Sequence, residues 1–425
     1  MKRLLSLIIS GIFATSALSF GQTDTGLQRV FSDLNEVMVS ISNPETPKGS
    51  YLENPNINRV VLGNERITND YSFLINNKRV GLVTNQTGVN ADMVKTVDVL
   101  YNYKNATLTS IYSPEHGLDG TARAGAYVDS YTDTRLNLPV YSLYGKTREP
   151  SKAMLDNVDV LVFDMQDIGS RTYTYISTLN YVMKAAAKHG KSVVVLDRPN
   201  PLGGTIVDGY IAKDKYLTFV GVDNLPIQHG MTTGELAKFF NRKINCNLSV
   251  VPMQNYNRNM IWQDTGLPFV ATSPNIPNIQ SAFGYIATGM GEGTTVGQGD
   301  KFTWVGSAGL ISETFAKKLN DAKLPGVRFV PESKSSRGGA KMIITDYKSF
   351  NPTKTAIYIL TTANQLKPLN VPVETKGVIP MFEKIWGGTE FGKALKNQWT
   401  AEQVIKSYQG ELNAFKNLRK TYLIY

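Results

Sequence analysis

The chain has 425 residues, 42% of them hydrophobic and 19% charged, so it has the composition of a globular protein long enough for two domains. Its formal charge of +10 favours anionic ligands, but no basic stripe is interleaved with aromatic residues, which argues against nucleic acid as a partner. The single cysteine, Cys246, excludes an intramolecular disulfide framework.

The first 21 residues have the layout of a secretory signal peptide. Lys2 and Arg3 form the charged start, residues 4–18 the apolar segment, and residues 19–21 the cleavage site. This apolar segment is short for a membrane span, and no later stretch approaches the ~18 apolar residues that a span needs. We therefore expect a periplasmic or secreted mature chain without a membrane span, with an uncleaved anchor as the alternative.

Residues 22–65 contain several proline breakers and predict a short helix followed by a linker. Residues 66–270 then alternate apolar strands with helices. Strands are predicted at 79–84, 108–112, 159–163 and 192–196, and helices at 92–103 and from 176 to a C-cap at His189-Gly190. Successive strand–helix–strand units predict a parallel sheet with helices on both faces, that is, an α/β domain.

A proline-rich segment at 267–277 is a candidate hinge, and a differently patterned half, residues 271–425, follows it. The pattern there predicts an α+β domain. Its expected parts are a glycine-rich loop at 289–297, a helix at 311–319, strands at 327–330 and 341–345, and one final amphipathic helix from Val404 to Leu418.

Four successive predicted strands end in polar clusters. The carboxyl ends of parallel strands meet at one edge of a sheet, where open α/β sheets bind ligands. One cluster alone could be a turn or a cap, but four in succession predict a working site. The clusters are Asn85 and Gln86; Glu115 and His116; Asp164, Gln166, Asp167 and Arg171; and Asp197, Arg198 and Asn200.

Several kinds of site fit the sequence poorly. The loop at 291–297 does not join a first strand to a helix, so it is neither a dinucleotide fingerprint nor a P-loop, and we expect no cofactor. His116, His189 and His229 lack the spacing of metal ligands, so we expect no metal. His229 precedes a helix entry capped by Thr232, and it fits a structural and a functional role equally well.

Carboxylates with hydrogen-bonding neighbours remain: Glu115, Asp164, Asp167 and Glu292, with Tyr173 nearby. Paired carboxylates suit the cleavage of a glycosidic bond, in which one acid protonates the leaving oxygen and a second group assists at the anomeric centre. The acid must keep its proton near neutral pH, which requires burial or a like-charged neighbour.

Several long motifs, in order, resemble one bacterial family: the exo-acting β-N-acetylmuramidases of glycoside hydrolase family 171, formerly a domain of unknown function. The resemblance covers roughly residues 65–425. The motifs are GLVTNQTG (81–88), SPEHG (113–117), VFDMQDIGSRTYTYIS (162–177), LDRPNPLGG (196–204), HGMTTGEL (229–236), SPNIP (273–277) and EGT (292–294).

The resemblance implies a Rossmann-like N-terminal domain, a smaller C-terminal domain, and an active site in the cleft between them. It also implies release of N-acetylmuramic acid from the non-reducing end of peptidoglycan fragments, without nucleotide or metal, with Glu115 as the catalytic carboxylate. We predict Glu115 as the general acid, with His116 and Asp167 shaping its pKa and Glu292 or Asp164 as the second group.

The expected substrate-binding residues lie at the same sheet edge or in the motifs: Asn85, Asp164, Gln166, Arg171, Tyr173, Arg198, Asn200, His229 and Asn275. N-acetylmuramic acid carries a lactyl carboxylate, with which Arg171 or Arg198 could pair. Alternatively, these arginines tie loops together through neighbouring aspartates.

Two segments depart from the family pattern, so the resemblance does not predict the fine substrate specificity. Residues 299–306, GDKFTWVG, replace an arginine-rich turn and a Pro-Phe-Glu, and residues 337–340 replace a cysteine-bearing segment. The first departure motivates an alternative, a periplasmic muropeptide-binding protein without catalysis. An esterase or amidase acting on cell-wall substituents is a third hypothesis. Whether the anomeric configuration is retained or inverted stays open.

Overall fold

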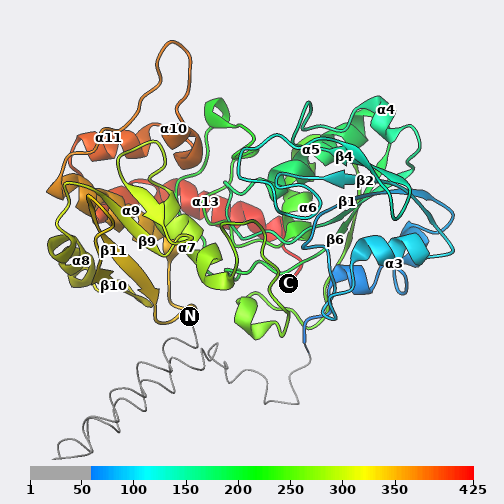
Figure 1. Ribbon diagram of the computed structural model, residues 1–425, viewed down its shortest axis with the longest axis horizontal. Helices are drawn as coiled ribbons and strands as arrows, with labels where there is room; N and C mark the ends of the chain where they lie inside the picture. The colour runs from blue at the N-terminus through cyan, green and yellow to red at the C-terminus, as the bar shows by residue number, and fades with distance from the viewer. Residues whose placement is uncertain (1–58) are drawn as a thin grey trace, which may run out of the picture. The chain divides into compact units, whose positions relative to one another are not determined.

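The structure, a computed structural model, describes residues 59–425 (Figure 1). The expected signal peptide, the short leading helix and most of the linker lie outside the described residues. Within residues 59–425, no helix is both long and apolar enough to cross a membrane.

The first half of the described chain builds a seven-stranded sheet in the order β3-β4-β2-β1-β5-β6-β7. Its strands are β1 (Arg79–Thr84), β2 (Thr107–Ser113), β3 (Tyr131–Asp133), β4 (Leu138–Ser142), β5 (Val160–Asp164), β6 (Ser192–Leu196) and β7 (Asn247–Val251). All neighbours are parallel except β3, which is antiparallel to β4. The chain leaves β1 toward β2 and later continues from β5 on its other side, so the order reverses between β1 and β5.

Helices cover both faces of this sheet. Helices α5 (Tyr175–Lys188) and α6 (Thr233–Ile244) pack on one face, where alternate strand residues such as Leu161 and Phe163 share their core. Helix α3 (Thr96–Asn102) shares the core on the other face with Val160 and Val162. Burial on both faces explains why β5 is apolar without alternation.

The second half contains a four-stranded antiparallel sheet in the order β10-β11-β9-β8, drawn at the opposite end of Figure 1 from the first sheet. Its strands are β8 (Gly297–Gly299), β9 (Trp304–Ala308), β10 (Val327–Pro331) and β11 (Arg337–Ile344). The helices of this half are α7 (Ile279–Gly289), α8 (Ser312–Asp321), α9 (Pro352–Leu366), α10 (Met381–Trp386), α11 (Glu390–Lys396), α12 (Ala401–Ser407) and α13 (Gln409–Arg419). The predicted fold class, a Rossmann-like parallel sheet followed by a smaller α+β part, is confirmed.

The final helix was predicted wrongly as one continuous element. The structure divides it into α12 and α13 at Tyr408. The Tyr408 hydroxyl donates to Asp208 Oδ1 at 2.8 Å, and its ring packs 4.8 Å from that of Tyr210. These contacts lie about 200 residues away along the chain, so the apolar periodicity of the segment could not reveal them.

Candidate active site

A pocket of about 290 Å³ opens beside the loop that follows β2. Its walls include that loop, residues 172–174 just before α5, residues 273–276, helix α7, the glycine-rich loop and α10. The structure brings five of the predicted site residues to this pocket: Glu115, His116, Tyr173, Asn275 and Glu292.

Glu115 is held by hydrogen bonds to both of its carboxylate oxygens. The main-chain amide of Gly125 donates to Oε1 at 2.8 Å, and the Thr174 hydroxyl donates to Oε2 at 2.6 Å. The side chain is only 8% exposed, although it lines the pocket. Glu115 is therefore oriented before any substrate binds, as a preorganised catalytic group should be.

His116 follows in the left-handed backbone region, with φ at 73°, and Gly117 continues the turn at 80°. The His116 Nδ1 lies 2.7 Å from the Ala122 carbonyl oxygen. Because a carbonyl only accepts, Nδ1 carries the hydrogen and Nε2 is left as the second ring nitrogen for the pocket. The strained turn thus brings both halves of the Glu–His pair to one cavity.

Glu292 comes from the glycine-rich loop and is the other carboxylate of the pocket. Its side chain is exposed, but the surrounding walls desolvate it enough to raise its pKa above the ordinary value. A glutamate with a raised pKa keeps its proton closer to neutral pH, which suits an acid–base role.

Aromatic rings form much of the remaining wall. Tyr173 packs edge-on against Tyr285 at 5.6 Å between ring centroids, and Tyr285 packs against Phe302 at 5.2 Å. Phe302 lies in the segment that departs from the family pattern, at the end of three left-handed residues, with φ values of 48°, 54° and 69° for Asp300, Lys301 and Phe302. The departure therefore does reach the pocket wall.

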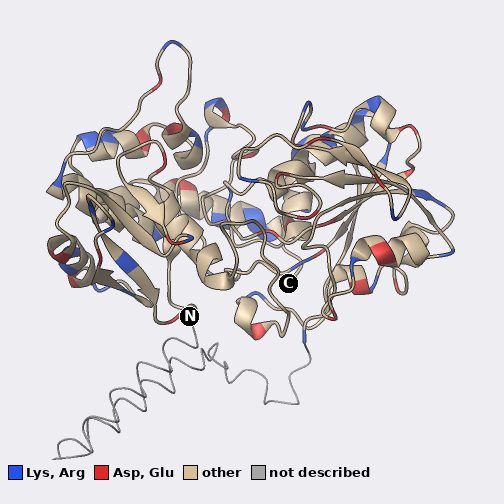
Figure 2. Ribbon diagram, viewed as in Figure 1, with Lys and Arg blue, Asp and Glu red and all other residues tan. Residues whose placement is uncertain are grey.

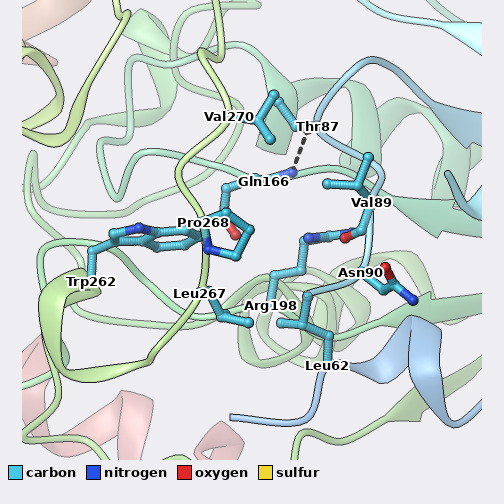
Figure 3. A pocket seen from close by; sticks show the side chains of 10 residues that line it. All are labelled: Leu62, Thr87, Val89, Asn90, Gln166, Arg198, Trp262, Leu267, Pro268 and Val270. Atoms are coloured by element: carbon cyan, nitrogen blue, oxygen red, sulfur yellow. Dashed lines mark hydrogen bonds between the residues drawn. The ribbon is translucent and has the colours of Figure 1, made fainter. Parts of the chain in front are cut away.

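Asp164 and Arg198 do not line this pocket but form a buried ion pair. Arg198 Nε donates to Asp164 Oδ1 at 2.5 Å, and Thr96 also donates to the carboxylate at 2.5 Å. Arg198 and Gln166 border a separate cavity of only about 10 Å³ (Figure 3). That space is about the size of a single water molecule and cannot hold a sugar.

The side chains of Gln166, Asn85 and Asn200 form hydrogen bonds with main-chain groups of the loops at the sheet edge. The Gln166 side chain donates to the carbonyls of Asp167 and Pro199, both at 2.8 Å, and its main-chain amide donates to Thr87 (Figure 3). Asn85 accepts from the Thr87 amide at 2.9 Å and lines a different cavity, and Asn200 accepts from the Leu202 amide at 3.0 Å.

Arg171 is fully buried and bonded to main-chain carbonyls from three segments. It donates to Tyr210 at 2.9 Å, Leu225 at 2.7 Å and Ile385 at 2.5 Å. Burial lowers the pKa of Arg171 to about 9. Its guanidinium thus binds loops together, although through carbonyls and not through an aspartate.

Asp167 and His229 are both buried and close to each other, and neither lines the pocket. Their nearest polar atoms, Asp167 Oδ2 and His229 Nε2, are 4.0 Å apart, which is too long for a direct hydrogen bond. The Gly169 amide donates to the same Asp167 oxygen at 2.7 Å. Burial raises the pKa of Asp167 to about 7 and lowers that of His229 to about 3, so both groups favour their neutral forms.

Two side chains near Glu115 were not singled out from the sequence, and neither was Gly125, whose amide donates to it. Thr174 lies within the RTYTY run of a motif, where alternation with Tyr173 and Tyr175 was the available signal. Tyr144 lines the pocket, and burial together with the Glu115 carboxylate raises its pKa. Nothing in the sequence around Tyr144 indicated this position, because the loop that carries it is 29 residues from Glu115.

Among residues 59–425, no cluster of three or more His, Cys, Asp or Glu side chains is arranged to hold a metal ion. Figure 2 shows basic and acidic residues interspersed over both halves of the described chain.

Comparison with known proteins places the chain in a family. The N-terminal model of the exo-β-N-acetylmuramidase NamZ matches residues 80–280, and the C-terminal model matches residues 283–425. The peptidoglycan β-N-acetylmuramidase NamZ of Bacillus subtilis is 40% identical over 382 residues, which cover 86% of this chain and 92% of the relative.

Two solved structures of DUF1343 family proteins from Bacteroides fragilis are also similar. The match to the first has a TM-score of 0.77 and 34% sequence identity, and it covers 87% of this chain and 100% of the solved chain. The match to the second has a TM-score of 0.64 and 27% sequence identity, and it covers 86% of this chain and 99% of the solved chain. The chain therefore belongs to the exo-β-N-acetylmuramidase NamZ family of glycosidases.

Proposed function

We propose that this enzyme releases N-acetylmuramic acid from the non-reducing end of peptidoglycan fragments, with Glu115 as a catalytic carboxylate. The observation that carries the proposal is the position of Glu115: a preoriented carboxylate in the wall of a pocket that also holds Glu292 and His116. The pocket volume of about 290 Å³ is close to the lower end of the range of ligand sites, ~300 Å³, as expected for one sugar residue.

Glu115 Oε2 is the oxygen best placed to exchange a proton. Oε1 faces a main-chain amide, which only donates, whereas Oε2 faces the Thr174 hydroxyl, which can turn to accept from a protonated acid. Glu292, with its raised pKa, supports the role of second carboxyl better than Asp164 does, because Asp164 is neutralised by Arg198. His116 Nε2 would accept or relay the proton that Glu115 exchanges.

The test is the turnover of a chromogenic β-N-acetylmuramide. Glu115→Gln keeps the size of the side chain but removes its proton exchange, and we expect kcat to fall by at least ~10². Glu313→Gln, an exposed carboxylate on α8, is the matched control and should retain wild-type turnover. Undiminished turnover by Glu115→Gln would refute the role of Glu115.

The extracytoplasmic location expected from residues 1–21 remains a prediction. It would place the enzyme where peptidoglycan fragments are accessible.

A further inference from the structure

We propose that Arg148, beside the pocket, binds the carboxylate of the substrate; this inference rests on the function proposed above. The pocket walls contain two carboxylates, Glu115 and Glu292, and no lysine or arginine. N-acetylmuramic acid adds a further carboxylate on its lactyl group. A nearby cation would stabilise this negative charge in a pocket whose own titratable groups include two acids.

Arg148 lies in the loop between β4 and α4 (Lys152–Leu155) and is positioned by two aromatic rings. Its guanidinium carbon is 4.6 Å from the centroid of the Tyr144 ring and 4.7 Å from that of Phe219. The two rings also pack on each other at 5.8 Å. Cation–π contacts hold a guanidinium by its face, so the N–H groups at its edge stay available for a planar acceptor such as a carboxylate.

The Arg148 guanidinium is also close to the site. Tyr144 lines the pocket, where burial and the Glu115 carboxylate raise its pKa and the Arg148 guanidinium opposes this rise, so both charges lie near the Tyr144 hydroxyl. Val220, the neighbour of Phe219, lines the pocket as well. A carboxylate bound by Arg148 would therefore belong to a sugar whose other groups reach Glu115.

Arg148 forms no ion pair with an acidic residue of the described part of the chain. Its side chain is exposed, and it is absent from the ion pairs formed within residues 59–425. The two arginines predicted for this role are engaged elsewhere, Arg198 by Asp164 and Arg171 by three carbonyls. Lys301, next to Phe302 of the pocket wall, is a competing cation, and so is Arg123, next to Ala124.

The test compares calorimetric binding of N-acetylmuramic acid and of its neutral lactyl methyl ester. We expect the wild-type enzyme to bind the acid more tightly than the ester. Arg148→Gln should weaken binding of the acid by roughly 10- to 100-fold, the loss expected for hydrogen bonds to a charged group, and leave binding of the ester unchanged. On the chromogenic muramide, the same variant should raise KM while kcat stays near the wild-type value.

Matched variants separate this role from general electrostatics. Lys146→Gln removes an exposed positive charge two residues away and should bind both ligands like the wild type. Unchanged ester binding by Arg148→Gln shows that the variant is folded. Equal losses on acid and ester, no loss on either, no acid binding by the wild type, or a loss confined to Lys301→Gln would each overturn the inference. Failure of the proposed function is distinct, since it appears as a wild-type enzyme without muramide turnover.

Discussion

At the scale of single residues, the pocket separates side chains that the sequence could not tell apart. Glu115, Asp164 and Asp167 are all acidic residues at or just after the ends of buried strands, yet they have three different environments. Glu115 lines a cavity, Asp164 forms an ion pair with Arg198, and Asp167 is desolvated by burial and does not line the pocket. Only the first has both an oriented carboxylate and access to a ligand.

Asp167 should make stability depend on pH. In the folded chain Asp167 keeps its proton up to about pH 7, whereas its ordinary pKa is 3.8. Between these values the folded state binds more protons than the unfolded state, so rising pH lowers the free energy of unfolding, by roughly 4 kcal/mol in all. We expect Asp167→Asn to remove this loss. The free energy of unfolding of the variant, relative to that of the wild type, should therefore be higher at pH 8 than at pH 5.

Thermal unfolding midpoints at pH 5 and 8 measure this difference. Asp129→Asn, at an exposed aspartate, is the control and should follow the wild type at both pH values. Parallel midpoint curves for Asp167→Asn and the wild type would show that Asp167 is not protonated in the folded chain.

At the scale of elements, helix α6 begins as its sequence predicts. The Glu235 amide donates to the Thr232 hydroxyl oxygen at 3.2 Å, and the Glu235 side chain accepts from the Thr232 amide at 3.0 Å, which together form a capping box. The structure adds a third bond, in which the Thr232 hydroxyl donates to Asp197 at 2.9 Å. The cap thus also fixes the acidic end of β6.

Replacing this cap should lower stability without changing chemistry. Thr232→Ala loses one cap bond and one buried partner of Asp197, and we expect a cost of about 1–2 kcal/mol, seen as a lower thermal midpoint. Thr232→Ser keeps the hydroxyl and should recover most of the loss. Turnover per folded molecule should be unchanged in both, since Thr232 is not a pocket residue. A wild-type midpoint for Thr232→Ala would contradict the structural role of the cap.

At the scale of the whole molecule, Arg171 joins segments that are far apart in sequence. Its bond to Ile385 spans 214 residues and connects the segment before α5 with α10 in the second half. Ile385 itself lines the pocket. We therefore expect this buried guanidinium to help hold the pocket wall in place.

Arg171→Met should be severely destabilising, because it takes the arginine donor from the buried carbonyls of Tyr210 and Ile385, at ~1–3 kcal/mol each, while the Leu225 carbonyl keeps the Ala212 amide as a donor. We expect a marked fall in the thermal midpoint, together with reduced muramide turnover. Arg328→Met, at an exposed arginine on β10, is the control and should change neither property. A variant Arg171→Met with wild-type stability but weakened binding of N-acetylmuramic acid would instead indicate a direct role in substrate binding.

The sequence by itself determined the parallel sheet, the common edge of its four polar strand ends and the family. These follow from local periodicity and from contiguous motifs, and the strand order β2-β1-β5-β6 does bring the four ends together. Helix α9 and strand β7 were not among the predicted elements, and Tyr408 divides the last helix through contacts distant in sequence.

Only the tertiary structure decided which polar side chains face the pocket. The apolar pattern of a strand predicts where the strand ends at the sheet edge. The direction of each side chain in the following loop depends on residues that are distant in sequence and that the fold brings beside it. Asp164 meets Arg198 from 34 residues away, and Glu115 meets Thr174 from 59. A buried charge or hydrogen-bond donor needs a partner, and the fold supplies that partner from a distant part of the sequence. Polar residues whose side chains are paired in this way have structural roles, and those that line the pocket remain able to contact a substrate.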